Sequence, residues 1–225
     1  HLNRGFFSRM ERGRPWVRVK LGMSLDGRTA LASGESKWIT SEAARADVQR
    51  WRARAGALMT GIATVLADDP RLTVRLPEGE AFVPPLRVVL DERGRLPALS
   101  RVLTDGAAPT LVVHGDDVVP DYDDDVRAFA VRRVEGGLDL SAVLSQLAQR
   151  GVNELQAEAG ATLSGALLKA GLVDELLLYI APVLLGERGR PLFAGIDPAT
   201  MADRIGLKLV ETRPVGPDLR LLLVP

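Results

Sequence analysis

Two ionisable side chains stand where an open α/β sheet would bind a ligand. Glu158 ends the apolar segment 153–158 and precedes Gly160 and a helix-forming segment. A carboxylate at the carboxyl end of a buried strand lies at the ligand-binding edge of such a sheet, where burial perturbs its pKa. Lys20 lies near the end of the alternating segment Trp16–Met23, although a solvated strand face explains a lysine there equally well. Glu158 is therefore a candidate acid or substrate clamp, and Lys20 is a second candidate.

The segment that follows Glu158 suits a phosphate. In "EAGATLSGALL" a strand ends near Gly160 and a helix begins. A helix start directs unpaired backbone N–H groups and a positive dipole end at whatever lies there. A plainer interpretation is that Gly160 only makes a tight turn and that Gly165 only permits close packing. The residues alone leave both interpretations open.

Carboxylates and arginines also gather in "TVLADDPRLTVR", residues 64–75. Asp68, Asp69 and Pro70 are a typical turn sequence. Arg75 makes a local anion site possible, because a guanidinium can bind two phosphate oxygens at once. This segment is interpreted first as a turn and second as an anion site.

Several other kinds of site are excluded or disfavoured. The Gly-x-Gly-x-x-Gly fingerprint of dinucleotide-binding folds is absent, and no glycine precedes Lys-Ser/Thr as in a P-loop. "DYDDD" (Asp121–Asp125) lacks the glycine and distal glutamate of a calcium loop, so a solvated loop explains it better. With no cysteine and two histidines, a zinc site or a catalytic triad has little to draw on. We expect no metal site and interpret His114 as structural.

Composition indicates an ordinary globular protein. The 225 residues are 46% hydrophobic and 26% charged, and 29 basic residues balance 29 acidic ones. Nothing in that balance attracts nucleic acid or an anionic membrane, and the longest apolar run, Leu176–Leu185, is too short to span a bilayer. Absence of cysteine fits a reducing compartment, so we expect a cytoplasmic protein.

The elements that position these residues alternate between strand and helix. Thr40 or Ser41 can cap a helix whose buried face carries Ala44, Val48, Trp51 and Ala55, and which ends at Gly56. Further helices are expected at 62–68, 140–150 and 161–170, and further strands at 57–61, 85–92, 110–115, 126–133, 153–158 and 174–185, with two final strands after residue 206.

This alternation predicts an α/β fold with a mostly parallel sheet covered by helices and a C-terminal antiparallel hairpin. "LPEGEAFVPP" (Leu76–Pro85) is expected to be a surface loop. Residues 1–14, with several arginines among apolar residues, are expected to form a linker-like arm, and residues 15–225 a single domain.

Three stretches together resemble one known family. "GFFSRMERGRPWVRVKLGMSLDGRTALASGESKWITSEAARADVQRWRA", "TGIATVLADDPRLTVR" and "EAGATLSGALLKAGLVDELLLYIAPVLLG" closely resemble the reductase domain of the bacterial bifunctional riboflavin-biosynthesis deaminase-reductase. The resemblance covers nearly the whole chain in order and weakens in 78–135 and after Phe193. It implies a dihydrofolate-reductase-like fold, a mixed sheet flanked by helices.

The implied reaction is the NADPH-dependent reduction of 5-amino-6-(5-phosphoribosylamino)uracil, with hydride delivered to the first carbon of the sugar. By the same resemblance, Ser36, Arg52 and Arg75 would hold the substrate phosphate, and the backbone around Leu72 would line that pocket. Glu158 and Lys20 would position the substrate and transfer a proton, and which of them donates is open; Asp68 is counted with them.

The resemblance also implies where the cofactor binds. Gly22, Trp38, Thr64 and Asp68 would contact the dinucleotide, and Asp69 would only form the turn. The residues at the helix start would cradle the phosphates: Gly160, Ala161, Thr162, Leu163, Ser164, Gly165 and Ala166.

The chain departs from many relatives at one position, where Glu92 replaces a serine after the strand-ending aspartate. A carboxylate is an awkward neighbour for a 2′-phosphate, which leaves the choice between NADPH and NADH open. Arg93 or Arg95 could compensate by pairing with that phosphate, and the sequence does not decide between these outcomes.

The resemblance has consequences for partners. The zinc-deaminase signature of relatives is absent, so we expect reduction without deamination, and fusion to an N-terminal deaminase in a longer protein. Relatives self-associate, and the apolar segment "DELLLYIAPVLL" favours a homodimer or larger oligomer. Two alternatives stay open: a reductase of the same fold acting on another pyrimidine or pteridine, and a silent nucleotide-binding or assembly domain.

Overall fold

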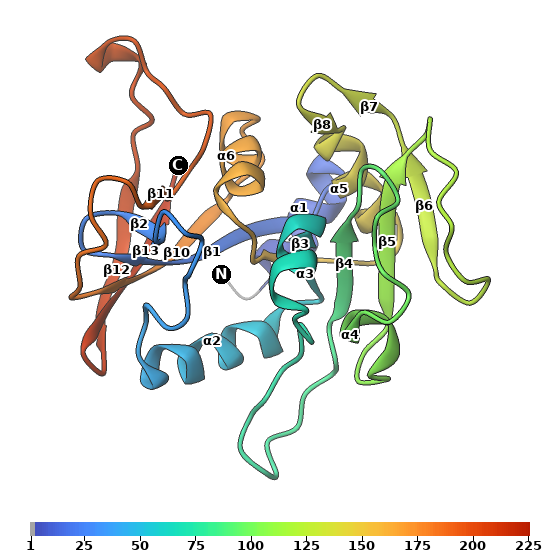
Figure 1. The fold of residues 1–225 in the computed structure, drawn as a ribbon, viewed down its shortest axis with the longest axis horizontal. Coiled ribbons are helices and arrows are strands. Elements are labelled where there is room, and N and C mark those ends of the chain that lie inside the picture. Colours follow the sequence, from blue (N-terminus) through green and yellow to red (C-terminus); the bar gives the residue numbers. More distant parts are fainter. Residues whose placement is uncertain (1–2) are drawn as a thin grey trace. The chain divides into compact units, whose positions relative to one another are not determined.

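The computed structural model describes residues 3–225 and divides the chain into two compact units. The first unit contains the described residues up to Trp16 together with Arg50–Ala157, and the second contains Val17–Gln49 and Glu158–Pro225. Figure 1 labels the elements of both. The prediction that residues 15–225 form a single domain stays a prediction.

The first unit is built on strands that all run parallel. They are ordered β9 (Glu154–Ala157), β3 (Ala57–Gly61), β4 (Leu86–Leu90), β5 (Thr110–Gly115) and β6 (Ala128–Val131). The helices of this unit are α1 (Arg4–Arg12), α3 (Ile62–Asp68), α4 (Arg101–Thr104) and α5 (Leu140–Gln149), and β7 (Arg133–Val134) pairs with β8 (Gly137–Leu138). Parallel strands need crossover connections, and α3 and α5 belong to them.

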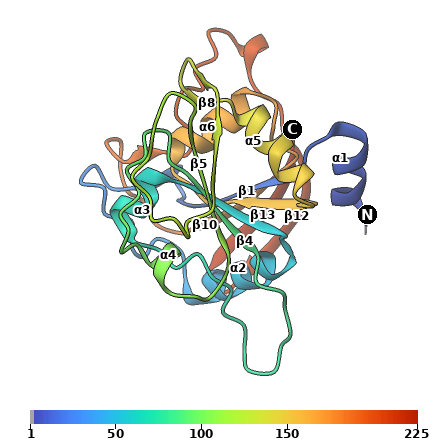
Figure 2. The same cartoon turned by 90° about the vertical axis from the view of Figure 1, so that its right-hand side faces the viewer.

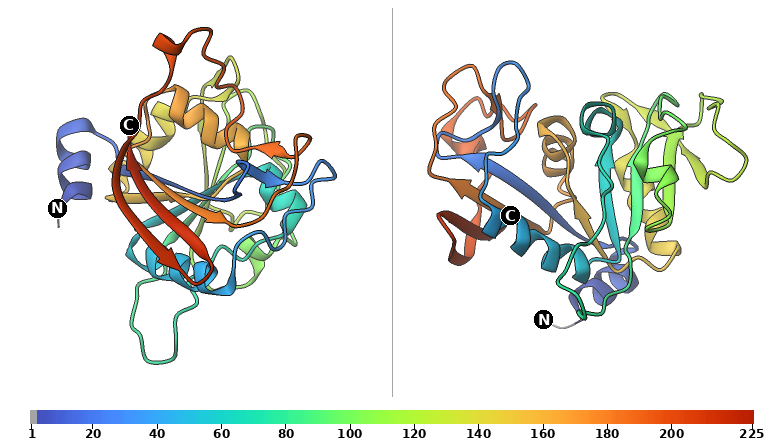
Figure 3. Two further views of the ribbon diagram at one scale, coloured as in Figure 1. Left: turned by 90° about the vertical axis from the view of Figure 1, so that its left-hand side faces the viewer. Right: turned by 60° about the horizontal axis from the view of Figure 1, so that its bottom comes forward.

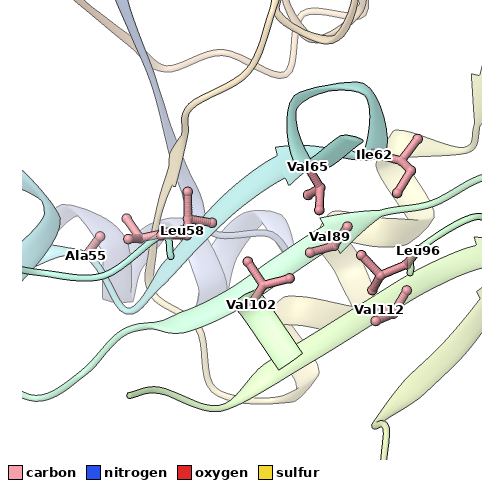
Figure 4. Close-up of a cluster of buried hydrophobic side chains, with 9 residues drawn as sticks. Ala55, Leu58, Ile62, Val65, Val89, Leu96, Val102 and Val112 are labelled. Carbon is pink, nitrogen blue, oxygen red and sulfur yellow. The ribbon is translucent and has the colours of Figure 1, made fainter. Parts of the chain in front are cut away.

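Aliphatic side chains form the core of the first unit. Leu58 and Val89 come from neighbouring strands, Val65 comes from α3, and none of them is more than 2% exposed. Figure 4 shows these side chains converging with those of Val102 and Val112. Burying each such side chain contributes about 1.5–3 kcal/mol, so this cluster anchors α3 on the sheet.

The second unit joins a parallel strand pair to an antiparallel hairpin. Its strands are ordered β12 (Lys208–Val215), β13 (Asp218–Val224), β10 (Glu175–Ala181) and β1 (Trp16–Ser24). β1 and β10 are parallel, with Lys20 opposite Leu177 and Gly22 opposite Tyr179. β2 (Arg28–Ala30) pairs with β11 (Arg190–Pro191), and α6 (Ala161–Lys169) and the short helix η1 (Met201–Asp203) complete the unit. Figure 3 shows the red hairpin of β12 and β13.

Helix α2 (Glu42–Arg54) follows its expected pattern. The hydroxyl of Ser41 accepts a hydrogen bond from the backbone N–H of Ala44 over 3.2 Å, which makes Ser41 the cap. The four apolar residues expected on its inner face are all buried: Ala44, Val48, Trp51 and Ala55. The helix begins in the second unit, and its last residues belong to the first.

The predicted fold class is confirmed: strands and helices alternate, most strand pairs are parallel, and the chain ends in a hairpin. Residues 76–85 form a loop without regular structure, as expected, visible in Figure 1 as the long teal-to-green excursion before β4. The strand expected at 174–185 is shorter, because β10 ends at Ala181, directly before Pro182.

The arm at the start of the chain contains a helix that the sequence analysis does not predict. α1, labelled in Figure 2, approaches the backbone of Asn153 so closely that a Cβ on Gly5 would lie 2.8 Å from its carbonyl oxygen. Arg4 also forms a 3.5 Å ion pair with Glu154. Phe6, Phe7 and Met10 lie at helical spacing but stay exposed. The face that the helix buries contains Gly5 and Ser8, so it carries no apolar pattern from which it could be predicted.

One expected solvated surface is buried. Arg18 shares a strand face with Lys20, yet it is 1% exposed and its Nε lies 2.6 Å from the carboxylate of Glu175 on β10. Of the two interpretations left open for this face, the solvated one does not hold at Arg18, because β10 supplies the anionic partner that a desolvated arginine requires; Lys20 on the same face is half-buried.

Candidate functional site

The start of α6 is open to solvent. Gly160 caps the helix in an extended conformation, and no heavy atom lies within 4 Å of where a Cβ on Gly160 would be. Gly160 and Thr162 are exposed, while Ala161 and Leu163 are half-buried. The first backbone N–H groups of a helix have no partner within the helix, so this end can receive an anion. Glu158 lies two residues earlier, directly after β9, and is half-buried.

The middle of α6 serves packing. A Cβ on Gly165 would lie 2.0 Å from the carbonyl oxygen of Ala194, and the N–H of Ala194 donates to the carbonyl of Ala161 over 3.0 Å. Ser164 is fully buried, with its hydroxyl 3.4 Å from the carbonyl of Ala159. The contact with Ala194 therefore agrees with the plainer interpretation, that Gly165 permits close packing. The cofactor contacts of Gly160–Ala166 stay a prediction.

Strand β1 places Lys20 beside a buried aromatic ring. The Nζ of Lys20 lies 5.8 Å from the centroid of the Tyr179 ring, and Tyr179 is directly opposite Gly22 across the parallel pair. A Cβ on Gly22 would lie 3.1 Å from the Thr40 methyl group. Lys20 and Gly22 thus share one strand face, as their spacing predicts.

Trp38 presents an exposed aromatic platform. Its side chain is 70% exposed, and the guanidinium of Arg45 lies 4.5 Å from the ring centroid. Arg45 is fixed in turn by a 2.7 Å hydrogen bond from its Nη1 to the carbonyl oxygen of Thr40. A cation over one face of an indole ring stiffens the ring for stacking. Ser36, two residues before Trp38, is half-buried.

The predicted phosphate residues of the first unit are linked by one hydrogen bond. The Nη1 of Arg52 donates to the carbonyl oxygen of Thr73 over 2.7 Å, between Leu72 and Arg75 in the sequence. Leu72 is buried with a left-handed backbone, φ 50°, so its side chain enters the core. The side chain of Arg75 is exposed.

Helix α3 carries Thr64 and Asp68 four residues apart, which places both on one helical face. Asp69 ends the helix in a left-handed conformation, φ 39°, and its carboxylate accepts a 2.9 Å hydrogen bond from the N–H of Arg101. The prediction that Asp69 forms the turn is confirmed.

The shortest ion pair of Glu92 is with Arg133, a residue that the sequence did not single out. Arg133 reaches Glu92 from β7 with Nη2 at 2.6 Å and Nε at 2.9 Å, and its Nη1 also binds Asp117 at 2.7 Å. Arg93 lies 4.0 Å from the same carboxylate and is mostly exposed. The strongest contact comes from 41 residues away, which no local pattern in the sequence indicates.

The buried aspartate before Glu92 has a structural role. Asp91 is fully buried, and its Oδ2 accepts hydrogen bonds from the N–H of Leu96 at 2.7 Å and the hydroxyl of Tyr122 at 2.8 Å. Burial, followed by this hydrogen bond, raises the pKa of Tyr122 well above its usual value. The Nδ1 of His114 lies 3.0 Å from the Gly115 carbonyl, in keeping with a structural role.

The predicted residues fall into two groups. The second unit holds Lys20, Gly22, Ser36, Trp38, Glu158 and Gly160–Ala166, and the first holds Arg52, Thr64, Asp68, Leu72 and Arg75. Sequence analysis missed Arg45, Tyr179 and Arg133. Of these three, only Arg45 could have been noticed from the local sequence, because it lies in the first turn of the expected helix after the Ser41 cap.

Among residues 3–225, no group of three or more His, Asp or Glu side chains is placed to bind a metal ion. Over the same residues, every helix is too short or too polar to cross a bilayer.

The fold is that of dihydrofolate reductase. An Enterococcus faecalis dihydrofolate reductase matches 93% of this chain and 95% of its own with a TM-score of 0.52 at 12% identity. The two chains therefore share an α/β fold.

Within that class the family is specific. The model of the RibD C-terminal domain matches residues 15–221, and the chain belongs to this family. The riboflavin biosynthesis protein RibD of Escherichia coli K12 is 45% identical over 99% of this chain and 63% of its own length. RibD of Acinetobacter baumannii superposes with a TM-score of 0.88 at 41% identity, covering all of this chain and 62% of that one.

A Thermotoga maritima structure named as a diaminohydroxyphosphoribosylaminopyrimidine deaminase/5-amino-6-(5-phosphoribosylamino)uracil reductase is also similar. It has a TM-score of 0.85 at 26% identity over 98% of this chain and 59% of that one. The chain therefore spans about three fifths of the length of the relatives it matches.

Proposed function

We propose that the chain is an oxidoreductase that reduces 5-amino-6-(5-phosphoribosylamino)uracil to its ribitylamino product with NADPH. Membership of the RibD C-terminal domain family carries the proposal, and the similar Thermotoga maritima protein is named for this reductase activity. The residues available in each unit are of the types that the reaction needs.

The substrate phosphate is assigned to Arg52, Arg75 and Ser36. Arginine matches phosphate geometry because its planar fork donates two parallel hydrogen bonds. The Arg52–Thr73 hydrogen bond supports the assignment, because it limits the movement of the backbone on either side of Leu72. An ordered backbone loses less entropy when an anion binds.

The second unit fits a dinucleotide. The start of α6 has open space above Gly160, where an added Cβ would meet no atom, and exposed N–H groups there would hold phosphate oxygens. The exposed Trp38 ring, backed by Arg45, suits an aromatic ring of the cofactor. Gly22, Thr64 and Asp68 are assigned to the same ligand. Bound NADPH supplies a hydride for the first carbon of the sugar.

Glu158 and Lys20 are assigned to the sugar and its proton. When hydride adds to the first carbon, the bond from that carbon to the ring oxygen breaks and the oxygen takes up a proton. Glu158 or Lys20 gives that proton, and the other orients the sugar hydroxyls. Arg133 is shared between the carboxylates of Glu92 and Asp117, so it offsets the negative charge of Glu92 in part, and the Glu92–Arg133 pair is the element through which we expect cofactor preference to be set.

Steady-state oxidation of NADPH by the purified chain tests the proposal, with enzymatically generated substrate. NADH and the dephosphorylated substrate are run in parallel. We expect substrate-dependent oxidation that is faster with NADPH and with the phosphorylated compound. NADPH binding without turnover would favour a reductase of the same fold acting on another pyrimidine or pteridine, and no binding would favour a silent domain.

Two assembly proposals accompany this function. The chain is joined to a deaminase domain in a longer protein, which its coverage of the relatives supports; the size of the native protein on an immunoblot tests this. It also forms a homodimer, although not through the segment first considered. β10 lies between β13 and β1 and is almost wholly buried, so its apolar character reflects the core of the second unit.

The homodimer is instead assigned to β12, the outer strand of the second unit. Seven of its eight residues are exposed, among them Leu209 and Val210. An exposed apolar edge strand pairs readily with another strand, and the mixed charges of Lys208, Glu211 and Arg213 suit a second antiparallel copy.

A further inference from the structure

A buried tyrosine lies under the proposed substrate lysine. Tyr179 has no exposed surface, and the Nζ of Lys20 lies 5.8 Å from its ring centroid. This is within the roughly 6 Å over which an ammonium group is attracted to the face of an aromatic ring. The sequence analysis did not select Tyr179, and the proposed reaction does not use it.

The strand register creates this contact. β1 and β10 run parallel, with Gly22 directly opposite Tyr179 and Lys20 opposite Leu177. Lys20 and Gly22 are two residues apart and face the same way. Gly22 has no side chain, and the space beside it is occupied by the methyl group of Thr40, so the contact with the Tyr179 ring on this strand face comes from Lys20.

The far end of the ring is fixed by a charged pair, Asp47 and the buried Arg220. The Tyr179 hydroxyl donates to Oδ2 of Asp47 over 2.7 Å, and the same oxygen accepts from Nη1 of Arg220 over 2.7 Å. Arg220 is 5% exposed and its Nη2 also contacts Glu211. Burial, followed by the Asp47 hydrogen bond, raises the pKa of Tyr179 well above its usual value, so the hydroxyl remains a donor at neutral pH.

We propose that Tyr179, held by Asp47 and Arg220, is a positioning residue whose ring face fixes the ammonium of Lys20. This inference rests on the proposed function, in which the ammonium of Lys20 takes part in the reaction. Lysine has four rotatable side-chain bonds and loses much rotamer entropy when it is ordered. If the Tyr179 ring already holds the ammonium in place, this rotamer entropy is not lost again in each turnover. Removing the ring should therefore lower kcat more than it weakens cofactor binding.

The first test observes Lys20 directly. The chain has four lysines, at positions 20, 37, 169 and 208, so reductive methylation with ¹³C-formaldehyde gives few resonances. Lys20→Arg identifies its signal. The signal of an ammonium group above an aromatic ring is shifted upfield by the ring current. We expect this shift for Lys20 in the wild type and in Tyr179→Phe, and we expect it to be lost in Tyr179→Leu. Unchanged signals of the other three lysines control for folding. A Lys20 signal that stays in place in Tyr179→Leu would overturn the proposal.

The second test uses kinetics. Tyr179→Phe keeps the ring and should retain kcat within about threefold, whereas Tyr179→Leu should lower kcat at least tenfold with KM for NADPH changed less than twofold. Equal losses in both variants would assign the effect to the hydroxyl and overturn the ring-face role. If Tyr179→Leu does not fold, Tyr179→Met fills more of the space. A wild-type protein without reductase activity would refute the proposed function. The chemical shift of the Lys20 signal would still show whether the Tyr179 ring holds the ammonium.

Discussion

The guanidinium of Arg52 donates a hydrogen bond to the carbonyl oxygen of Thr73 over 2.7 Å. The last turn of α2 thereby holds the segment that contains Leu72 and Arg75. Three elements of the first unit depend on this contact: a helix end, a buried left-handed leucine, and an exposed arginine. The assignment of the substrate phosphate to this segment can therefore be tested one residue at a time.

Replacing Arg75 should weaken binding of the phosphorylated substrate alone. Arg75 is exposed, so Arg75→Gln removes a charge without disturbing the core. We expect KM for the phosphorylated substrate to rise about 10- to 100-fold, since hydrogen bonds to charged groups are worth about 1.5–3 kcal/mol. KM for the dephosphorylated substrate should not change.

Arg71→Gln is the matched control for Arg75→Gln, because its side chain is also exposed four residues away. It should leave both KM values unchanged. If Arg75→Gln raises KM equally for both substrates, the phosphate assignment is wrong.

Replacing Glu158 should slow turnover far more than it weakens NADPH binding. Glu158→Gln keeps the shape of the side chain but removes its carboxylate, and loss of a general acid or base costs about 10²- to 10⁴-fold in rate. Stopped-flow turnover and fluorescence titration of NADPH separate the two effects. Glu187→Gln, in an exposed segment of the second unit, should behave as wild type. Equal losses in turnover and in affinity would argue against a chemical role for Glu158.

A methyl group at Gly165 should destabilise the fold. The added Cβ would lie 2.0 Å from the carbonyl oxygen of Ala194, far inside contact distance, and overpacking costs about 1–3 kcal/mol. Urea unfolding of Gly165→Ala measures this cost. Gly206→Ala, where no atom lies within 4 Å of the new group, should change stability little. A stable Gly165→Ala variant would mean that the Ala194 segment moves freely.

The carboxylate of Asp26 should make stability depend on pH in a narrow acidic range. Its hydrogen bonds with the Ser24 hydroxyl and with the N–H groups of Leu185 and Gly186 lower its pKa to about 2. Because the pKa of Asp26 in the folded protein lies below the unfolded value of about 3.9, the charged carboxylate stabilises the fold above about pH 3.9. This stabilisation is lost as the pH falls toward 2.

Urea midpoints between pH 5 and pH 2 measure this effect. Asp26→Asn should be less stable than wild type at pH 5, and the gap should close by pH 2. A gap that stays constant over this range would show that the carboxylate charge is not involved.

A charge on β12 should disrupt the proposed dimer. Val210 is 55% exposed on the outer strand, so Val210→Lys places a desolvated ammonium in the proposed interface, where an unpaired charge is costly. Light scattering after size-exclusion chromatography should show a dimer for wild type and a monomer for the variant. Arg93→Lys, on an exposed loop of the first unit, should remain dimeric. A dimeric Val210→Lys would place the interface elsewhere.

Much of the fold was predictable because its signals are local. Period-two alternation and capping residues are read within one turn or one strand, as in the Ser41 cap of α2 and the terminal hairpin. The α1 helix was missed because its burial depends on Gly5 meeting Asn153, a contact across nearly 150 residues. Its own apolar side chains, Phe6, Phe7 and Met10, stay exposed, so they do not mark the buried face.

Glu158, Lys20 and the start of α6 were predicted as site residues from the sequence itself, since residue type and position at a strand end indicate a possible chemistry, and they stay predictions. The resemblance added roles for Arg52, Arg75, Trp38 and Asp68. What only the tertiary structure decided is which groups surround these residues: Arg133 pairs with Glu92, Glu175 buries Arg18, and Tyr179 lies beneath Lys20. Each of these contacts joins residues at least 41 positions apart, and sheet register and packing, which depend on the whole chain, determine such partners.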